Sequence, residues 1–438
     1  MHPRNPYRIP PDFRQLAQTY PPLQPCLVPS ETGFTIDFKD EVAQKHLTEA
    51  LLHRDFGISL SLPPGRLCPP VPNRLNYVLW IQDILQATGS AGPVRGVDIG
   101  TGASAIYPLL ACKLEPDWSF ITTDVDDVSL ASARSNLAQN GLLARVDVVP
   151  TTTAAPVFAA LSSPHARFDF TMCNPPFYSS LADVAASADA KALGPSAVCT
   201  GAHVEMITPG GESVFVRRMI DESVELGERC RWYTSMLGKM SSLTDVISAL
   251  RERGVDNYGI TEFVQGTTRR WAVAWSFSDL RLPETIARIA NPHLQGLMPP
   301  RNTLRQPVPP TASAKDADHP TEILSAVLAS VEGARIVADD DRIAAGDGDR
   351  SACAFMVHAA HNTWSRGARR KQLRGAAEPP APNPSLGLVC GVRWVYPASD
   401  DGAGRVLECR WVRGRDRALF ESFASHVGRK VAAALKTA

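Results

Sequence analysis

Short apolar runs alternate with amphipathic helical patterns through most of the chain. In its middle part, the strand-like runs are residues 96–99, 118–123, 145–150 and 168–173, and the helical patterns between the first three are 105–114 and 128–140. Further helices are expected at 40–56, 75–86, 212–226 and 243–253, and further strands at 232–237, 258–264 and 271–277. Strands and helices that alternate at this spacing favour a right-handed, mostly parallel sheet covered on both faces, which is an α/β fold.

The pattern weakens after this region and then changes. Residues 281–320 carry many prolines among Lys, Ser and Asp, which predicts a linker rather than a core. Beyond it, a helix or strand–helix edge is expected at 321–337 and an acidic loop at 339–349. Two strand-like runs at 386–396 and 404–412, followed by a helix at 416–435, predict a small C-terminal α+β domain over residues 321–438.

Composition excludes several classes of protein. Lys and Arg total 45 and Asp and Glu total 45, so affinity for nucleic acid would have to come from local patches. No run approaches the ~18 apolar residues of a membrane span. The 9 cysteines form no C-x-x-C pair and the 10 histidines show no metal-ligand spacing, so neither a disulfide framework nor a metal site is expected.

A glycine-rich turn follows the first central strand, in the sequence Asp98-Ile99-Gly100-Thr101-Gly102-Ala103-Ser104. Gly100 and Gly102 permit a tight turn and a close backbone approach to a ligand. The turn lacks the third glycine of G-x-G-x-x-G and the lysine of a phosphate-binding loop. An Asp before G-x-G suits a cofactor with an ammonium group, which points to S-adenosyl-L-methionine. Asp124, at the end of the next strand, is the candidate for the cofactor's ribose hydroxyls, while Asp126 and Asp127 are expected to cap the following helix.

The tetrapeptide Asn174-Pro175-Pro176-Phe177 follows the fourth strand-like run. The Asn174 side chain and the Pro175 carbonyl can accept hydrogen bonds from a planar amine, and Pro176 stiffens the turn. Phe177 offers a face on which an aromatic base can stack. A rigid Pro-Pro turn without chemistry is the alternative.

The candidate residues Gly100, Asp124, Thr153 and Asn174 all follow predicted strands. Ligands of parallel α/β sheets bind beyond the carboxyl ends of the strands, so these residues are expected on one rim. The long stretch 178–211 that follows the catalytic turn shows little periodicity, and a substrate-clasping loop is favoured there.

Basic residues gather in three places. Residues 1–40 begin with a proline-rich segment containing Arg4, Tyr7 and Arg8, which cannot be a regular helix and is either an RNA-binding arm or a frayed terminus. Lys239 and the pair Arg269-Arg270 lie in the locally basic region near the last strands, where phosphate contacts and a solvated hairpin tip are the alternatives. Residues 366–438, including Arg366, Arg369, Arg370, Lys371 and Arg374, contain more than twice as many Lys and Arg as Asp and Glu.

Taken together, these motifs resemble the eukaryotic U6 small nuclear RNA adenine-N6 methyltransferase family (methyltransferase-like protein sixteen) over about residues 1–278. The segments that carry the resemblance are Met1-His2, Arg4-Asn5, Pro11-Asp12-Phe13, Asp55-Phe56-Gly57, Arg74-Leu75-Asn76-Tyr77, Asp98 to Ser104, Val125-Asp126-Asp127, Met172 to Phe177, Arg231-Trp232-Tyr233, Met236 to Lys239, Thr261-Glu262-Phe263 and Arg270-Trp271-Ala272.

The resemblance implies a class I (Rossmann-like) methyltransferase domain of seven strands, expected here at residues 41–280. It implies that Arg74, Gly100, Ser104, Asp124, Thr153 and Asn174 surround the cofactor; the turn itself adds Asp98 and Gly102. It also implies RNA contacts by the arm, an RNA stem-loop substrate, work in the nucleus with the cytoplasm left open, and an RNA-binding C-terminal domain of kinase-associated-1-like shape.

Some positions depart from the animal members of that family. Asp124 stands where they have Glu, and Pro6 where they have a basic residue. Thr151-Thr152-Thr153 lacks their gating lysine, and Thr267 replaces an arginine. These departures leave open whether an autoinhibitory loop of the animal type gates the cofactor site, whereas the catalytic turn is intact.

The resulting hypothesis is an S-adenosyl-L-methionine-dependent RNA adenine-N6 methyltransferase in which Asn174, Pro175, Pro176 and Phe177 form the catalytic turn. Two alternatives are a protein glutamine methyltransferase, because an amide amine suits the same turn, and a non-catalytic RNA-binding regulator that retains the fold. The sequence does not predict the oligomeric state.

Overall fold

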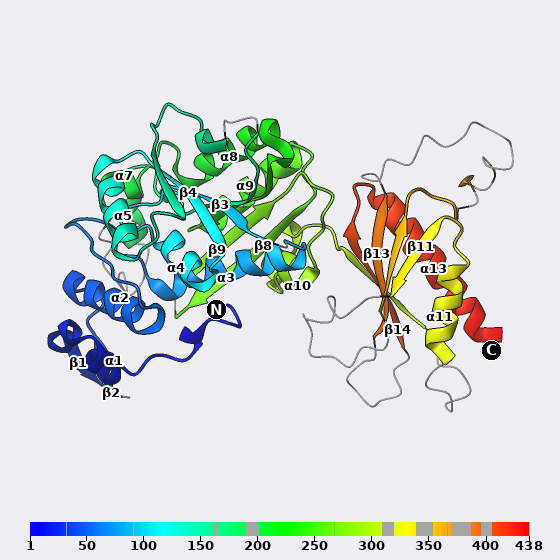
Figure 1. The fold of residues 1–438 in the computed structure, drawn as a ribbon, viewed down its shortest axis with the longest axis horizontal. Coiled ribbons are helices and arrows are strands. Elements are labelled where there is room, and N and C mark those ends of the chain that lie inside the picture. Colours follow the sequence, from blue (N-terminus) through cyan, green and yellow to red (C-terminus); the bar gives the residue numbers. More distant parts are fainter. Residues whose placement is uncertain are drawn as a thin grey trace. The chain divides into compact units, whose positions relative to one another are not determined.

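The computed structural model describes residues 1–438 except 32, 91, 162–164, 190–200, 267, 309–318, 339–353, 366, 369, 371–386, 396–404 and 438. The chain forms two compact units (Figure 1). The first unit contains Met1–Ser278 and Ile286–Pro299, and the second contains Asp279–Thr285 and Pro300–Ala438. No helix in the described ranges is both long and apolar enough to cross a membrane.

The first unit is built on a mixed sheet of 7 strands in the order β5-β4-β3-β6-β7-β9-β8. These are β3 (Val94–Ile99), β4 (Trp118–Asp124), β5 (Val146–Pro150), β6 (Phe168–Cys173), β7 (Cys230–Leu237), β8 (Tyr258–Gln265) and β9 (Thr268–Trp275). The five neighbouring strands β5, β4, β3, β6 and β7 pair in parallel. Strand β9 runs antiparallel to both β7 and β8. The predicted α/β fold with a seven-stranded sheet is thereby confirmed.

Strand β3 lies at the centre of this sheet and is buried on both faces. Val97 and Ile99 join the core cluster that contains residues of α8 and α9, so Asp98 between them points to the opposite face. A Cβ at Gly96 would lie 2.5 Å from the Phe170 ring and 2.8 Å from the Phe120 ring. The absence of a side chain at Gly96 therefore leaves room for two aromatic rings beside the strand. Because β3 is central in the sheet, the glycine-rich turn that follows it lies near the middle of the sheet edge.

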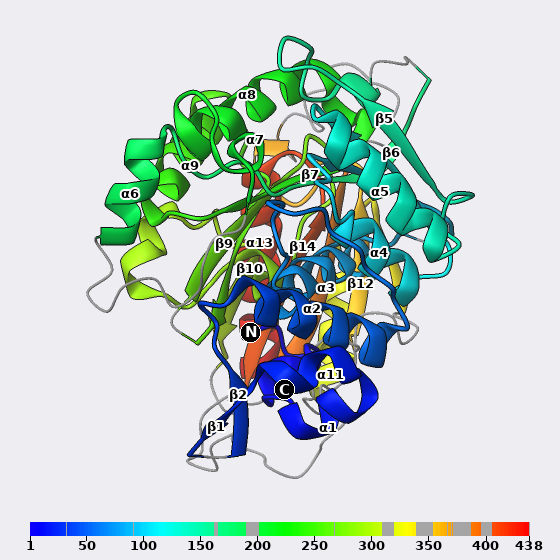
Figure 2. The ribbon, with the colours of Figure 1, turned by 90° about the vertical axis from the view of Figure 1, so that its left-hand side faces the viewer.

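Helices cover both faces of the sheet. Figure 2 shows α8 and α9 on one side and α3, α4 and α5 on the other. The bounds are α3 (Val71–Ala87), α4 (Ile106–Leu114), α5 (Asp127–Gln139), α6 (Leu181–Asp189), α7 (His203–Met206), α8 (Gly211–Leu226), α9 (Met240–Glu252) and α10 (Glu284–Ala287), with short 3-10 turns η3 (Ala159–Leu161) and η4 (Gly227–Arg229). The expected pattern of alternating strands and helices is confirmed, with boundaries shifted by a few residues.

The N-terminal segment is docked on the first unit. It contains η1 (Pro6–Arg8), α1 (Phe13–Thr19), η2 (Pro21–Cys26), β1 (Leu27–Ser30), β2 (Gly33–Ile36) and α2 (Glu41–Phe56). The buried Asn5 donates from Nδ2 to the Asn76 side chain at 2.8 Å and to the Pro72 carbonyl at 2.9 Å. The structure thus differs from the expectation of a frayed or fully extended arm, because Pro6 can begin a 3-10 turn that Asn5 caps.

The second unit is an antiparallel sheet of 5 strands in the order β10-β14-β13-β12-β11. Its elements are β10 (Thr303–Pro307), α11 (His319–Ala329), β11 (Ala334–Ala338), β12 (Ala354–Ala359), β13 (Leu388–Val395), β14 (Val406–Arg413) and α13 (Arg417–Thr437). One face of the sheet packs on both helices through a core that includes Leu324, Trp394, Trp411, Phe423 and Val427. An α+β unit was expected, with two strands, a final helix and a helix or strand–helix edge at 321–337, where α11 and β11 lie; strands β10 and β12 were not expected.

The proline-rich region at 281–320 is more ordered than a linker. Leu294 and Met298, within and after η5 (Pro292–Leu297), belong to the core of the first unit, and β10 forms an edge of the second sheet. Prolines are compatible with 3-10 turns and with edge strands such as β10, which ends at Pro307. Residues 309–318 of this region, the acidic loop at 339–349, and Arg366, Arg369, Lys371 and Arg374 lie outside the described residues.

Candidate active site

A cavity of about 410 Å³ opens at the carboxyl ends of β3, β4 and β6. Most of the residues proposed from the sequence line it. They are Arg74, Gly100, Gly102, Ser104, Asp124, Thr153, Asn174, Pro175 and Pro176. The expectation that strand ends would bring these residues to one rim agrees with this arrangement. Asp98 lies buried beneath the glycine-rich turn, and Phe177 lies beyond the lining.

The glycine-rich turn wraps around the end of β4. Gly100 and Gly102 have φ values of 70° and 63°, which residues with a side chain rarely adopt. The Gly102 N–H donates to Asp124 Oδ2 at 2.8 Å, and the Asp126 N–H donates to Asp124 Oδ1 at 3.0 Å. Burial raises the pKa of the Asp124 carboxyl, and these backbone N–H groups oppose the rise. Asp124 therefore fixes the turn and also faces the cavity.

Asp126 has the role expected for it. Its side chain accepts from the Ser129 N–H at the start of α5, which makes it the N-cap of that helix. It also pairs with Arg66 at 2.9 Å. This leaves Asp124 as the carboxylate of this segment that lines the cavity.

Asp98 is a completely buried carboxyl group without a hydrogen-bond partner on either oxygen. Burial raises the pKa of Asp98 to about 7. The nearby Thr101 hydroxyl opposes this rise although it does not reach hydrogen-bond geometry with either carboxylate oxygen, Asp124 raises the pKa further, and the charge of Arg74 lowers it. Such a group costs free energy in the folded state, since buried polar atoms are normally paired. An unpaired carboxylate below the glycine-rich turn would stabilise a nearby cationic ligand group.

Arg74 enters the site from the first turn of α3. It is only 5% exposed, and its guanidinium carbon lies 5.7 Å from the centroid of the Tyr107 ring. Its Nη1 donates to Asn174 Oδ1 over a long 3.4 Å contact. The buried arginine thus joins the wall of the cavity to the turn that contains Asn174.

Phe177 is held between neighbouring segments of the chain. A Cβ at Gly238 would lie 3.1 Å from its ring, and the Arg270 guanidinium carbon lies 5.2 Å from the ring centroid. Glu212 fixes the Gly238 turn, because its buried carboxylate accepts from the N–H groups of Gly238 at 2.6 Å and Lys239 at 2.8 Å. Burial raises the pKa of Glu212, and these donors oppose the rise.

The proposed RNA contacts separate into two groups. Lys239 and Arg270 lie beside the catalytic turn, over the rings of Tyr178 and Phe177 respectively. Arg269 pairs with Glu262 at 2.9 Å on the β8–β9 hairpin. Thr267, at the tip of this hairpin, lies outside the described residues.

The arm residues contact other parts of the first unit. Arg4 pairs with Asp83 and donates to the Leu79 carbonyl at 3.1 Å. Tyr7 is buried and donates to Asp55 at 2.7 Å, and Arg8 is exposed. The ring of Tyr7 could contact RNA only if the arm undocked, which differs from the role expected for it.

Sequence reasoning missed residues that follow the catalytic turn. Glu205, on α7, lines the cavity and accepts from the N–H groups of Leu67 at 3.0 Å and Ala202 at 2.8 Å. The Tyr178 N–H donates to the carbonyl of Met206 at the end of α7, and the Tyr178 carbonyl accepts from the Thr208 N–H, so this part of the 178–211 stretch lies against the residue that follows Phe177. Glu205 and Glu212 had no periodic signal, since each acts across the fold on backbone groups. Residues 190–200 lie outside the described residues.

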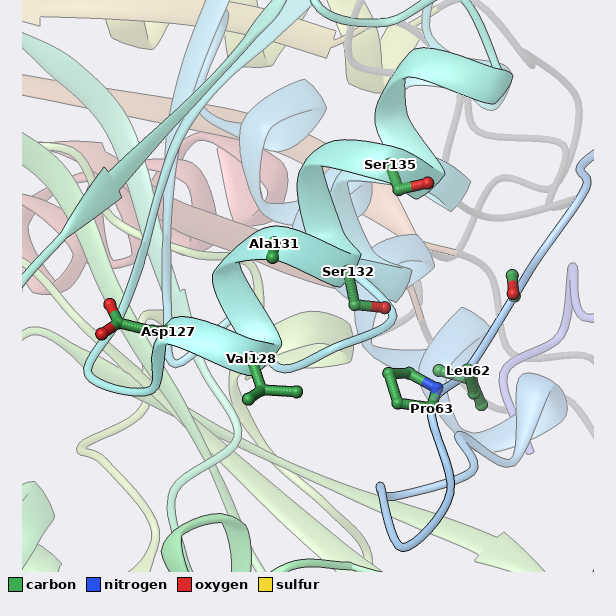
Figure 3. A pocket seen from close by; sticks show the side chains of 8 residues that line it. Leu62, Pro63, Asp127, Val128, Ala131, Ser132 and Ser135 are labelled. Carbon is green, nitrogen blue, oxygen red and sulfur yellow. The ribbon is translucent and has the colours of Figure 1, made fainter.

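A second depression lies along α5, facing the segment Ser61–Pro63 (Figure 3). Its lining includes Val128, Ala131 and Ser132, and Asp127 is the one ionisable side chain among them. The figure shows Asp127 at the far end of this row, away from Pro63. The cavity at the strand ends therefore remains the candidate active site.

A protein-family model described as RNA methyltransferase matches residues 1–279. The chain belongs to this RNA methyltransferase family. The resemblance inferred from the motifs is confirmed, and the family favours RNA over a protein glutamine as the substrate.

Relatives of known name share much of the chain. The zebrafish RNA N(6)-adenosine-methyltransferase mettl16 is 38% identical over 400 residues, which cover 88% of this chain and 83% of that protein. The fission yeast U6 small nuclear RNA (adenine-(43)-N(6))-methyltransferase is 33% identical over 397 residues, or 90% of this chain and 94% of that protein. The chain spans about half the length of the human relative, at 51%.

Solved structures of the human catalytic domain have the same fold as the first unit. The catalytic domain of human METTL16 in complex with the MAT2A 3′UTR hairpin 1 is 42% identical, with a TM-score of 0.59, and covers 64% of this chain and 96% of that one. The N-terminal domain of human METTL16 in complex with SAH is 40% identical, with a TM-score of 0.54, and covers 64% of this chain and 99% of that one.

Proposed function

We propose that this chain transfers a methyl group from S-adenosylmethionine to the N6 amine of an adenine in structured RNA, and that its substrate is U6 small nuclear RNA. The observation that carries the proposal is the position of Asn174 and Pro175 on the wall of the cavity, next to a glycine-rich turn built for a methyl donor. The names of the relatives support the choice of adenine and of U6 RNA. They also support work in the nucleus.

The cavity fits S-adenosylmethionine on chemical grounds. The unpaired carboxylate of Asp98 suits its ammonium group, and the positive φ values of Gly100 and Gly102 leave room for the backbone to approach the ligand. Asp124 would hold the ribose hydroxyls, because each of its oxygens has lone pairs beyond the one bonded to a backbone N–H. Arg74, Ser104 and Thr153 complete the lining. When bound, this cofactor supplies a methyl group already activated on a sulfonium.

The catalytic turn would position the acceptor. The Asn174 side chain and the Pro175 carbonyl accept hydrogen bonds from the adenine amine and orient its nitrogen, so most of the acceleration comes from positioning. The base, flipped out of its stack, packs on Phe177. Since the Arg270 guanidinium lies over this ring in the free protein, stacking on that face requires Arg270 to move. The cationic product releases its proton to water without a dedicated base.

RNA would be held by basic residues on both units. On the first unit, these are Lys239, Arg269 and Arg270 near the turn, together with Arg4 and Arg8 of the arm. Tyr7 supports the arm from inside the fold.

On the second unit, strand alternation places Arg305, Arg393 and Arg410 on the sheet face away from α11 and α13, because Leu407, Cys409 and Trp411 fill the core. Arg305 and Arg393 both pair with Glu408, and the face has a surplus of positive charge. We assign this face an auxiliary role in binding RNA phosphates.

The test is methyl transfer from radiolabelled S-adenosylmethionine to total RNA, followed by digestion and mapping of the labelled base. The expected product is N6-methyladenosine at one position of U6 RNA. Label in protein, label on another base, or no transfer to RNA would each overturn the proposal. A variant in the second unit, Arg410→Gln, is expected to weaken RNA binding without changing cofactor binding.

A further inference from the structure

The carboxylate of Asp183, close to the catalytic turn, accepts hydrogen bonds from the side chain of Lys239 and from both the backbone and the side chain of Ser179. Lys239 Nζ lies 2.9 Å from both carboxylate oxygens of Asp183. The Ser179 N–H and hydroxyl both donate to Asp183 Oδ2, at 3.0 Å and 3.3 Å. The donors come from two segments, the residues after Phe177 and the turn after β7, which are distant in the sequence.

These donors surround the place where the flipped nucleotide would lie. Ser179 follows Phe177 and Tyr178 in the chain, and Lys239 follows Gly238, which packs on the Phe177 ring. Lys239 Nζ also lies 5.1 Å from the centroid of the Tyr178 ring. A nucleotide whose base stacks on Phe177 therefore has its sugar-phosphate backbone within reach of Lys239 and Ser179.

The site is accessible and selects for negative charge. The side chains of Lys239 and Asp183 are 35% and 26% exposed, so a ligand from solvent can reach them. The hydrogen bond from Lys239, followed by that from the Ser179 N–H, lowers the pKa of the Asp183 carboxyl. An ammonium group, a backbone N–H and a hydroxyl are the donor types that proteins use to hold the phosphates of nucleic acids.

We propose that Lys239 and Ser179 form a binding site for an RNA phosphodiester next to the target adenosine, and that Asp183 occupies this site in the free protein. The inference rests on the proposed function and adds a ligand class, a serine and a competing carboxylate to it. RNA must exchange one anion for another at this position, so the internal carboxylate lowers the affinity for RNA. The contact between Asp183 and Ser180 does not involve the carboxylate, because there the Asp183 backbone N–H donates to the Ser180 hydroxyl.

The decisive experiment measures the affinity of the full chain for a fluorescein-labelled RNA hairpin with an unpaired adenosine, between 50 and 300 mM salt. Asp183→Asn removes the competing charge, and we expect the Kd to fall by about two- to fivefold, as for loss of an exposed ion pair. Lys239→Gln removes the phosphate contact, and we expect weaker binding with a salt slope smaller by about 0.7 to 0.9.

Matched controls make the same charge changes elsewhere. Asp221 and Arg253 form an exposed pair between α8 and α9. Asp221→Asn and Arg253→Gln should leave the Kd and the salt slope near those of the wild type. Ser180→Ala tests whether loosening the start of α6 changes RNA binding by itself, and it should not reproduce the gain of Asp183→Asn.

The outcomes are separable from those of the proposed function, because methyl transfer by the wild-type protein is not needed to read RNA affinity. The inference is overturned if Asp183→Asn binds the hairpin no more tightly than the wild type or than Asp221→Asn. It is equally overturned if Lys239→Gln keeps the wild-type salt slope. Tighter binding by Asp183→Asn that disappears in the Asp183→Asn, Lys239→Gln double variant would support it.

Discussion

One buried carboxyl group in each unit makes a clear contrast. In the second unit, the nearly buried Glu408 has each carboxylate oxygen bonded to an arginine, Arg305 at 2.8 Å and Arg393 at 2.7 Å. In the first unit, Asp98 is fully buried and neither oxygen has a partner. Among the described residues, all the buried side-chain N and O atoms without a partner lie in the first unit.

This difference indicates where ligand chemistry is concentrated. A folded protein normally satisfies its buried polar groups, and exceptions tend to occur at functional sites. Asp98 and Thr101 are both exceptions and both belong to the glycine-rich turn. In the second unit, the buried Glu408 instead fixes the side chains of Arg305 and Arg393 on the basic face of the sheet.

The largest expected effect is on the catalytic turn. Asn174→Ala removes the side-chain acceptor for the adenine amine, and we expect kcat to fall by at least ~100-fold, as for loss of a pre-organised hydrogen-bonding group. The measurement is methyl transfer to RNA alongside calorimetric binding of S-adenosylhomocysteine, which should remain largely intact. Wild-type transfer by this variant would remove the catalytic role from Asn174.

Asp98→Asn tests the cost of the unpaired carboxylate. The pKa of Asp98 is raised to about 7 by burial, so the folded state favours its protonated form. Its contribution to stability is therefore fully present at low pH and is lost as pH rises towards 7. We expect the variant to be more stable than the wild type at pH 8 by roughly 2–4 kcal/mol without ligand, and equally stable near pH 4.

Thermal unfolding at both pH values, with and without S-adenosylhomocysteine, checks this prediction. The ligand should stabilise the wild type more than Asp98→Asn, because only the wild type offers the carboxylate to its ammonium group. An Asp98→Asn variant that is less stable than the wild type at pH 8 would show that the carboxylate has a partner in solution.

Glu408→Gln tests the satisfied carboxylate of the second unit. Burial by itself raises the pKa of Glu408, but the hydrogen bonds and charges of Arg305 and Arg393 outweigh it, so the pKa is lowered overall. The stabilisation is hence present above the unfolded pKa of about 4.3 and is lost as pH falls below it. At pH 7 we expect the variant to lose about 1–3 kcal/mol of unfolding free energy.

Chemical denaturation followed by the tryptophans of the second unit measures this loss. Glu421→Gln is the matched control, since Glu421 is half exposed and pairs with Arg417 within α13. That control should change the free energy of unfolding by at most ~0.5 kcal/mol. Equal effects of the two substitutions would contradict the distinction between the buried and exposed pairs.

The smallest effect is expected from Gly238→Ala. The added Cβ would lie 3.1 Å from the Phe177 ring and 3.3 Å from Glu212 Oε2, so the ring has to shift slightly. We expect kcat/KM to fall by about tenfold, or roughly 1.4 kcal/mol, with cofactor affinity unchanged. Gly296→Ala is the control, because a Cβ there meets nothing within 4 Å; an unchanged rate in Gly238→Ala would mean that Phe177 does not need this wall.

Local sequence signals predicted much of the first unit. The short apolar runs of the strands, the glycines of the turn and the strand-end position of Asn174 all depend on near neighbours in the chain. The N-terminal arm and the proline-rich region were less predictable, because Asn5 and Leu294 gain their burial from residues far away in the sequence. In the second unit, β12 was not predicted: it pairs with β11 and β13, and its Val357 and Ala359 join a core formed by distant segments.

The sequence by itself determined the fold class, the methyl-donor turn and the amine-holding turn, because each depends on residue types at fixed short spacing. The tertiary structure alone decided the supporting groups. Glu205 and Glu212 bind backbone N–H groups in distant segments, and Asp183 of α6 meets Lys239, the residue that precedes α9. Such contacts leave no periodic pattern in the sequence, because they join residues that are far apart in the chain and meet only in the folded structure.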